Sequence, residues 1–421
     1  MRNTEKIFGQ IDGTIIFLYL LLMFFGWINI YASEYNDDLM KSIFDLSTKS
    51  GKQLLYIGIS LFIGFIILII DWRFFDSLSF IIYALVILFL IIVLFYSEEI
   101  GGATSWFKFG RFKVQPSEFA KFATALAVAK MLSLNKNISN TSLLKIKAYL
   151  IVLIPLILII LQNDLGTALV FISFILVLYR EGLSGNILIF GFLLGILFVL
   201  SLLIDPLIFV CIVSGIILTL FFLSSKKMKS IGLTSIALIV FNGFILSVNY
   251  IFNNVLSSHH QERINILLGK EFDPTGAGYN LLQSKIAIGS GGFFGKGFLN
   301  GTQTRFDFVP SQSTDFIFCT VGEEWGFLGS FLFVLIFMIL LIRIISLAEK
   351  QKSQFCRIYG YSVACILFSH FLINLGMTIG LAPTIGIPLP FMSYGGSSLI
   401  SFTILLFIFL NLNSYRMDIL R

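Results

Sequence analysis

Few of the residues in this sequence are charged. Only 12% of the 421 residues are Asp, Glu, Lys or Arg, and 57% are hydrophobic. An ordinary soluble domain carries roughly 25% charged residues, so water cannot be the main solvent of this chain. Because the apolar residues come in long uninterrupted blocks, membrane spans describe its organisation better than soluble domains do.

Cysteine and histidine are scarce as well. The four cysteines show no C-x-x-C spacing and mostly lie within or beside apolar blocks, which predicts reduced, buried thiols. The three histidines, His259, His260 and His370, lack the spacing of a zinc site. The net charge is +6, but no basic stripe with interleaved aromatic residues lies outside the apolar blocks, so we expect no nucleic acid partner.

Apolar blocks long enough to be membrane spans recur along the chain. They cover residues 13–32, 53–70, 77–96, 117–134, 148–162, 165–180, 187–204, 207–223, 231–252, 316–347, 358–380 and 391–412. This pattern predicts one all-α, polytopic membrane domain over residues 1–421, with about twelve transmembrane helices. As single helices, 148–180 and 187–223 would be about 50 and 55 Å long, which a hydrocarbon core of about 30 Å cannot hold. We therefore expect breaks at 162–164 and at Asp205-Pro206.

The distribution of Lys and Arg sets the orientation. The first block follows a short leader with Arg2 and Lys6, and because about eleven spans come after it, we interpret it as a retained helix instead of a signal peptide. With both termini in the cytoplasm, most basic residues fall in inner segments, as the positive-inside bias requires. The inner basic residues outside the termini are Arg73, Lys130, Lys136, Lys145, Lys147, Arg180, Lys226, Lys227, Lys229, Arg343, Lys350, Lys352 and Arg357.

The remaining basic residues face outward and need another explanation. They lie at residues 41–52, at 108–121 and in a large extracytoplasmic loop, 253–315, between the ninth and tenth spans. Long outer loops translocate regardless of charge, so simple tolerance is one interpretation, and a functional site is the other.

The fourth span begins with a polar motif at the predicted outer surface, residues 115–121. Glu118 and Lys121 share a helix face at positions i and i+3, so we expect them to pair. One interpretation is a structural ion pair near the membrane rim, where an unpaired charge costs roughly 2.5 to 3.5 kcal/mol. The other is that the helix start, Lys121 and Arg111 bind an anion such as a diphosphate.

Three further candidates lie at helix starts on the same side. Asp164 has so apolar a neighbourhood that it is a functional candidate by default. The run 393–398 places small, hydrogen-bonding residues where backbones can approach closely, which helix packing alone also explains. Asp315 stands between a polar loop and the tenth span, where a lipid-anchored substrate could meet it. It is a candidate general base, and a helix N-cap is the alternative.

The glycine-rich run 289–297 fails the tests for a nucleotide-binding loop. No glycine stands five residues before Gly295, Lys296 is followed by Gly297, and Phe294 occupies the third glycine position of a dinucleotide motif. We therefore predict a flexible outer loop that presents Lys296 and Arg305, and no organic cofactor.

Together these motifs resemble the SEDS family, whose members RodA and FtsW polymerise peptidoglycan from lipid II at the outer face of the bacterial cytoplasmic (inner) membrane. The matching segments are 115–121, 164–167, 276–279 with 283–285, 314–316 and 393–398. The segment 301–310 resembles RodA more than the division paralogue, which implies a role in cell elongation. The family has about ten spans, so residues 187–223 are expected to be an extra helical hairpin. Ser311-Gln312-Ser313 also replaces the charged residues that relatives often carry before the Asp315 motif.

The resemblance implies a glycosyltransferase with Asp315 as general base, which deprotonates the acceptor sugar hydroxyl while a polyprenyl diphosphate leaves. The residues expected to bind substrate or diphosphate are Trp106, Arg111, Gln115, Ser117, Glu118, Lys121, Asp164, Gln283, Lys285, Lys296, Arg305, Ser393, Tyr394, Ser397 and Ser398. A divalent ion, Mg²⁺ or Mn²⁺, is a candidate helper, with metal ligands unassigned. Expected partners are lipid II, a class B penicillin-binding transpeptidase, other elongation-complex membrane proteins and membrane lipid.

A lipid II flippase or transporter is the rival from another class. It predicts charges near the bilayer midplane and broken helices in matched halves, whereas the polar residues here crowd toward one face. A scaffold that only recruits partners is a third interpretation, and only activity separates these.

Overall fold

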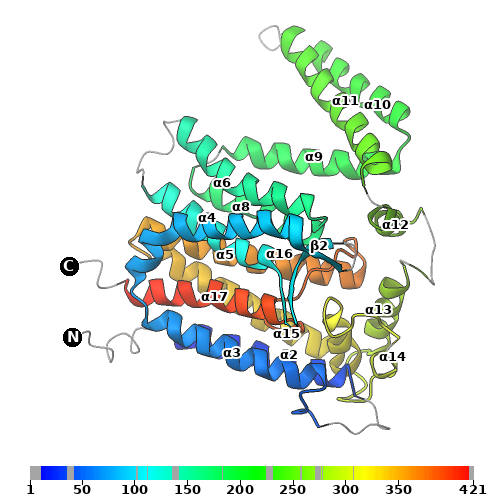
Figure 1. The fold of residues 1–421 in the computed structure, drawn as a ribbon. Helices are drawn as coiled ribbons and strands as arrows, with labels where there is room; N and C mark the ends of the chain where they lie inside the picture. Colours follow the sequence, from blue (N-terminus) through cyan, green and yellow to red (C-terminus); the bar gives the residue numbers. More distant parts are fainter. Residues whose placement is uncertain are drawn as a thin grey trace. The chain divides into compact units, whose positions relative to one another are not determined.

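The computed structural model describes two compact helical units. It covers residues 11–35, 42–100, 103–110, 112–134, 142–182, 184–223, 231–256, 258–270, 276, 278–306 and 308–416 (Figure 1). The first unit combines residues 1–183 with 280–421, and the second is residues 184–279. The candidate site residues that the structure describes belong to the first unit.

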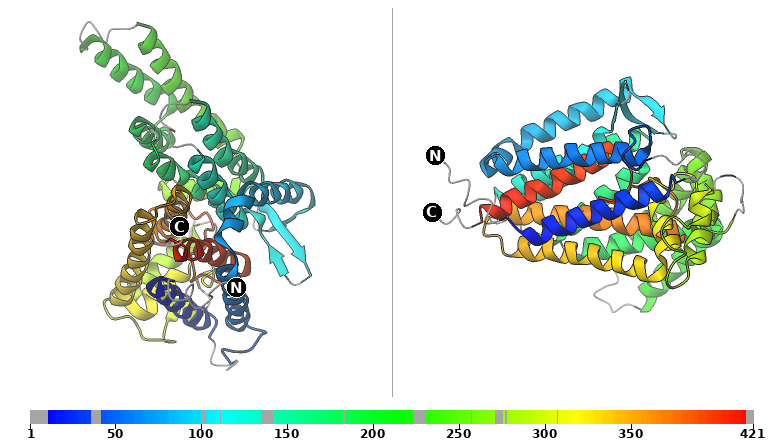
Figure 2. Two further views of the ribbon diagram at one scale, coloured as in Figure 1. Left: turned by 90° about the vertical axis from the view of Figure 1, so that its left-hand side faces the viewer. Right: turned by 90° about the horizontal axis from the view of Figure 1, so that it is seen from below.

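The first unit is a bundle of long apolar helices. Its helices are α2 (Gly13–Ala32), α3 (Lys49–Ile69), α4 (Trp72–Tyr96), α5 (Pro116–Ser133), α6 (Ser142–Leu161), α7 (Leu165–Ile172), α8 (Phe174–Arg180), α13 (Tyr279–Ser290), α14 (Thr302–Arg305), α15 (Ile317–Glu349), α16 (Gln354–Ile379) and α17 (Gly396–Ser414). Packed neighbours include α3 with α17, α2 with α15, and α15 with α16 (Figure 2).

The second unit contains the remaining helices. These are α9 (Gly185–Leu203), α10 (Pro206–Leu223), α11 (Ile231–Asn254) and α12 (Ser258–Leu267). Leu197, Phe209, Val213 and Ile245 form its small apolar core. The predicted hairpin 187–223 corresponds to α9 and α10, and α11 packs with them. Whether this hairpin is an addition to the family fold stays a prediction.

Every predicted span coincides with helical structure, and the polytopic all-α membrane class is confirmed. Within the described residues, nine helices are long and apolar enough to cross a membrane, and Ile146–Leu161 and Leu165–Arg180 are shorter apolar helices. Both predicted breaks are present: α9 ends at Leu203 before Pro206, and Asn163 adopts φ 57° between α6 and α7.

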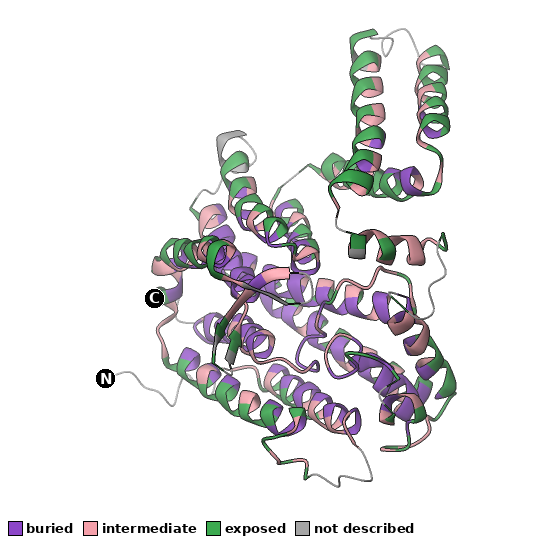
Figure 3. Ribbon diagram, turned by 45° about the vertical axis from the view of Figure 1, so that its right-hand side comes forward, coloured by how far each residue is buried: buried purple, intermediate pink, exposed green. Residues whose placement is uncertain are grey.

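Helix α5 falls outside those nine because its sequence is less apolar, yet most of it is enclosed. Fourteen of its residues are buried, many of them alanines, and it packs against α4, α6, α16 and α17. Small side chains allow neighbouring backbones to approach closely within a membrane bundle. In Figure 3 the inner helices are largely purple, while peripheral helices are green on their outward faces.

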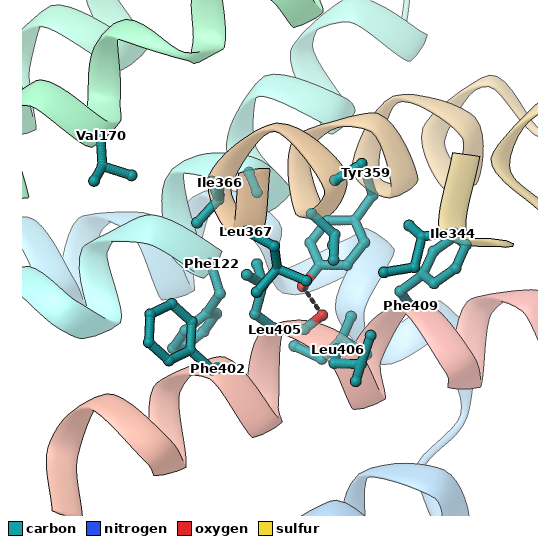
Figure 4. Close-up of a cluster of buried hydrophobic side chains, with 14 of the residues drawn as sticks. Phe122, Val170, Ile344, Tyr359, Ile366, Leu367, Phe402, Leu405, Leu406 and Phe409 are labelled. Carbon is teal, nitrogen blue, oxygen red and sulfur yellow. Dashed lines mark hydrogen bonds between the residues drawn. The ribbon is translucent and has the colours of Figure 1, made fainter. Parts of the chain in front are cut away.

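Aromatic and branched side chains of α17 join three helices in the centre of this unit. Phe402, Leu405 and Phe409 lie against α16, and Phe122 of α5 approaches Phe402 (Figure 4). The Tyr359 hydroxyl of α16 donates a hydrogen bond to the Leu405 carbonyl at 3.0 Å. This hydrogen bond links α16 to the backbone of α17.

The structure contains a small antiparallel sheet that the sequence did not predict. Its strands are β1 (Glu98–Ile100), β2 (Ala103–Phe109) and β3 (Phe112–Val114), in the order β1-β2-β3. Phe107 lies opposite Val114, and Gly110 adopts φ 61° at the turn. The sheet directly precedes α5 and places Trp106 on β2.

The segment predicted as a large outer loop, 253–315, also contains regular structure. Its described part holds α12, α13 and α14. The prediction of a flexible glycine-rich loop is wrong for 291–297, because this stretch is hydrogen-bonded to α15. Gly326 of α15 adopts φ 65° and breaks the helix, and Phe327 N donates to Gly292 O at 2.9 Å.

One end of the first unit carries four of the predicted inner basic residues, each paired with a carboxylate. Arg343 binds Asp12 at 2.6 Å, Lys130 binds Asp76 at 2.8 Å, Arg180 binds Glu349 at 3.1 Å, and Arg357 binds Glu181 at 2.8 Å. Three of these pairs join α15 to the start of α2, the end of α5 to the start of α4, and the end of α8 to the start of α16. The fourth, between Arg180 and Glu349, joins the ends of α8 and α15. The distribution of Lys and Arg in the sequence predicts that this end faces the cytoplasm.

Candidate active site

Asp315 lies in a tight turn at the opposite end, directly before α15. Its side chain is half-buried, and its backbone carbonyl accepts a 2.8 Å hydrogen bond from Asn374 Nδ2 of α16. The N-cap position of α15 belongs to Phe316, so the alternative interpretation of Asp315 as the N-cap residue is wrong. The turn instead places its carboxylate beside the segment that connects α16 and α17.

That connecting segment, residues 381–395, forms one side of the site. Gly386 adopts φ 75°, and a Cβ atom at this position would lie 3.4 Å from Asp315 Oδ2. Asn374 uses its second amide hydrogen to bind the Ile387 carbonyl at 2.7 Å. One side chain of α16 therefore fixes the backbone on both sides of the Asp315 carboxylate.

The run 393–398 binds the Asp315 turn directly. Ser393 Oγ donates to Thr314 O at 2.6 Å and accepts from Leu389 N at 2.8 Å. Tyr394 N donates to Ser313 O at 2.8 Å. Burial raises the pKa of the Tyr394 hydroxyl to about 12, so this group stays a neutral phenol at physiological pH.

Ser397 and Ser398 make other contacts. Ser397 Oγ donates to Lys113 O of β3 at 2.9 Å, and Ser398 Oγ donates to Gly395 O at 3.4 Å. Ser397 thus ties the small sheet to the start of α17.

Two polar residues of α3 were not predicted: one contacts the Asp315 turn and the other contacts the 381–395 segment. Lys49 Nζ donates to Ser313 Oγ at 3.0 Å, and its side chain is 46% exposed. Gln53 Oε1 accepts from Gly395 N at 3.2 Å. The sequence did predict that the basic residues at 41–52, which include Lys49, face outward. It could not show that Lys49 lies near Asp315, because the two residues are far apart along the chain.

Asp164 serves as an anchor between helices. Its Oδ2 accepts from Gln115 Nε2 at 2.8 Å and from Ser117 Oγ at 2.9 Å. Its Oδ1 accepts from Thr167 N at 3.1 Å as the N-cap of α7. Three of the predicted site residues therefore hold the starts of α5 and α7 together.

The predicted pair of Glu118 and Lys121 is confirmed, at 2.7 Å and with both side chains almost fully buried. Lys121 Nζ also lies 2.9 Å from His370 Nε2 and 4.5 Å from the ring centre of Phe402. The charge of Lys121 is thus compensated inside the bundle, and in this conformation the ammonium is not exposed to an anion in solvent.

Lys296 is likewise engaged. Its ammonium lies 2.6 Å from Glu323 Oε1, and this fully buried carboxylate also accepts from the backbone of Thr302, Gln303 and Thr304. Glu323 therefore fixes α14 and Lys296 on α15. At the end of α14, the Arg305 guanidinium lies 5.9 Å from the ring centre of Tyr35.

The other predicted residues lie on separate elements. Gln283 and Lys285 are on α13, which is fastened to the end of α16 by a 2.9 Å hydrogen bond from Ser284 Oγ to Thr378 O. Trp106 is half-buried on β2, and Arg111 lies outside the described residues. Among the residues that the structure describes, no group of three or more His, Cys, Asp or Glu side chains is placed to hold a metal ion.

These features define an integral membrane protein with a polar site at one end of a helical bundle. Residues 13–209 and 196–418 match the family model of the FtsW, RodA and SpoVE cell cycle proteins. The chain belongs to this family, which confirms the predicted resemblance.

Its relatives include several that are named peptidoglycan glycosyltransferases. MrdB of Escherichia coli (strain K12) is 30% identical over 395 residues, covering 93% of this chain and 90% of that protein. RodA of Treponema pallidum is 32% identical over 416 residues, covering 93% and 94%. Identity over nearly the whole chain therefore supports the resemblance to the RodA branch, in addition to the short motifs.

Solved structures share the fold over nearly the whole chain. A chain from a peptidoglycan synthase complex that coordinates polymerization and crosslinking matches with a TM-score of 0.72, at 25% identity and over 97% of this chain and 99% of that chain. RodA of Thermus thermophilus matches with a TM-score of 0.63, at 23% identity and over 97% and 98%.

Proposed function

We propose that this protein is a peptidoglycan glycosyltransferase that polymerises lipid II at the outer face of the bacterial inner membrane during cell elongation. The observation that carries the proposal is the placement of Asp315. Its half-buried carboxylate lies at the end of the bundle opposite the basic residues assigned to the cytoplasm, in a turn held by α3, α16 and the 381–395 segment. Relatives along the full chain carry the same enzyme name.

In this reaction Asp315 is the general base. It takes the proton from the acceptor sugar hydroxyl, whose oxygen then bonds to the anomeric carbon of the donor strand. The bond from that carbon to the polyprenyl diphosphate breaks, and the electron pair leaves with the diphosphate. A fixed carboxylate suits this role because a general base must lie within hydrogen-bond reach of the proton that it takes, and partial desolvation favours proton uptake. General base catalysis contributes typically about 10²- to 10⁴-fold to the rate.

The departing diphosphate requires cations. Lys49, at the Asp315 turn, lies 3.8 Å from Glu34 Oε1 but keeps a side chain that is 46% exposed, and Arg305, at the end of α14, is also partly exposed. We assign the diphosphate to these two exposed cations. Lys121 and Lys296 are compensated by Glu118 and Glu323, so we assign them to holding the site together. Preorganised charge of this kind stabilises the charge that develops in a transition state.

A divalent cation fits this chemistry only as a companion of the diphosphate. Among the described residues, no three His, Cys, Asp or Glu side chains are grouped to hold a metal ion, and we route no step through a protein-bound metal. We propose that such an ion, if required, is held mainly by diphosphate oxygens, which Mg²⁺ commonly uses together with few protein ligands.

The partner and the cellular location complete the proposal. The matched synthase complex couples polymerization to crosslinking, which supports a transpeptidase of the class B penicillin-binding type as the partner of this chain. The paired basic residues at the other end of the first unit support cytoplasmic termini.

The test is polymerisation by purified protein. We expect the wild type, with lipid II, its transpeptidase partner and a divalent cation, to make glycan strands, and Asp315→Asn to lose at least about 10²-fold in rate while remaining folded. Full activity of Asp315→Asn would refute the base assignment. Transbilayer movement of lipid II by the wild type without polymer would favour a flippase.

A further inference from the structure

His370 is a buried polar residue that the proposed reaction does not yet use. It lies on α16 one turn before Asn374, and only 1% of the residue is exposed. Its Nδ1 lies 3.1 Å from the Pro388 carbonyl, and its Nε2 lies 2.9 Å from Lys121 Nζ. The Phe402 ring packs edge-on against it, with ring centres 4.7 Å apart.

These contacts determine the tautomer of the ring. A carbonyl oxygen can only accept, so Nδ1 carries the hydrogen and donates it to Pro388. The ammonium of Lys121 can only donate, so Nε2 presents its lone pair to Lys121. His370 is therefore held neutral, with a defined orientation, between α5 and the 381–395 segment.

The Pro388 carbonyl belongs to the backbone beside the Asp315 carboxylate. Gly386, two residues earlier, is the position where a Cβ atom would lie 3.4 Å from Asp315 Oδ2. Asn374, one helical turn after His370, holds the Ile387 and Asp315 carbonyls. Consecutive turns of α16 thus hold consecutive carbonyls, at 387 and 388.

We infer that His370 is a positioning residue for Asp315: by binding the Pro388 carbonyl, and with its own orientation fixed by Lys121, it keeps the 386–388 backbone against the Asp315 carboxylate. The inference rests on the proposed function in that Asp315 is taken as the base. It assigns His370 neither a proton transfer nor a contact with substrate.

The variant His370→Phe tests this directly, because phenylalanine keeps an aromatic ring of similar size and removes both polar contacts. Displacing reacting groups by about 1 Å can cost about 10²-fold in rate, so we expect kcat to fall about 10- to 100-fold with little change in KM. His370→Gln, whose amide offers both a donor and an acceptor, should restore most of kcat, whereas the shorter His370→Asn should not.

Tyr359→Phe is the matched control. Tyr359 is also fully buried on α16 and also donates to a carbonyl, that of Leu405, but this bond lies away from the 381–395 segment. We expect wild-type kcat from this variant. Equal losses in Tyr359→Phe and His370→Phe would show a general packing effect, and wild-type kcat in His370→Phe would also refute the inference.

Hydrogen exchange gives a readout that does not depend on activity. In His370→Phe the amides of residues 385–393 should exchange faster than in the wild type or in Tyr359→Phe. Faster local exchange in a protein whose wild type makes no polymer would keep the positioning role and reject the proposed function. Unchanged exchange would reject the positioning role, whatever the activity. If His370→Phe fails to fold, the comparison passes to His370→Gln and His370→Asn. Equal kcat and equal hydrogen exchange in these two variants would refute the positioning role of His370.

Discussion

The buried pair of Glu118 and Lys121 permits a quantitative prediction about stability. Both side chains are at most 2% exposed, and Lys121 also donates to His370. Removing one partner of a buried ion pair typically costs about 3 to 5 kcal/mol, because the other charge remains uncompensated. We therefore expect Glu118→Gln and Lys121→Met each to lower the free energy of unfolding by about 3 to 5 kcal/mol.

The double variant should be more stable than either single variant. Glu118→Gln with Lys121→Met leaves no buried charge, and replacing a buried pair by uncharged side chains is often close to neutral. His370 Nε2 then loses its donor, which costs about 1 to 3 kcal/mol. The two single effects sum to about 6 to 10 kcal/mol, whereas the double variant should lose at most about 3 kcal/mol. The coupling free energy is the difference between these values and is therefore at least about 3 kcal/mol.

The measurement is reversible unfolding in mixed detergent micelles, monitored by circular dichroism as the denaturing detergent is increased. Asp76→Asn is the control, because the pair of Asp76 and Lys130 is 29% and 21% exposed and should contribute no more than about 1 kcal/mol. Additive effects in the double variant, or single variants within about 1 kcal/mol of the wild type, would refute this description of the pair.

Further predictions concern the site. Gly386→Ala forces a side chain into the left-handed region at φ 75°, so we expect a loss of about 1 kcal/mol of stability and a lower kcat, measured by unfolding and polymerisation; an unaltered kcat would contradict the close approach to Asp315. Lys49→Met should weaken kcat/KM more at low than at high salt, while Lys52→Met, an exposed neighbour on α3, should not; identical salt profiles would remove Lys49 from diphosphate binding. Chelation of divalent ions should slow polymerisation without changing the thermal stability of the substrate-free protein, and a fall in stability would instead indicate a protein-held ion.

The class of fold was accessible to sequence reasoning because membrane spans are local features. Twenty or so consecutive apolar residues bury themselves in lipid whatever their neighbours do, and breaks such as Asp205-Pro206 follow from backbone sterics. The sheet at 98–114 was missed because its strands are short and their pairing depends on partners. The hydrogen-bonded stretch 291–297 was missed because its partners on α15 lie about thirty residues away along the chain.

The site shows the same division. Motif resemblance selected Asp315, Asp164 and the run 393–398, and i to i+3 spacing paired Glu118 with Lys121. Spacing did not connect His370 to the site, because Lys121 is 249 residues away along the chain. Residue type alone also could not separate an exposed cation from a compensated one.

What the sequence determined by itself was therefore a helical membrane protein with polar motifs at one face, and its family resemblance selected Asp315 as the proposed base. Only the tertiary structure decided which charges are already neutralised, as Lys296 is by Glu323, and which backbone lies beside Asp315. The physical reason is that hydropathy and helix periodicity act over a few turns, whereas the environment of a charge depends on every helix packed around it.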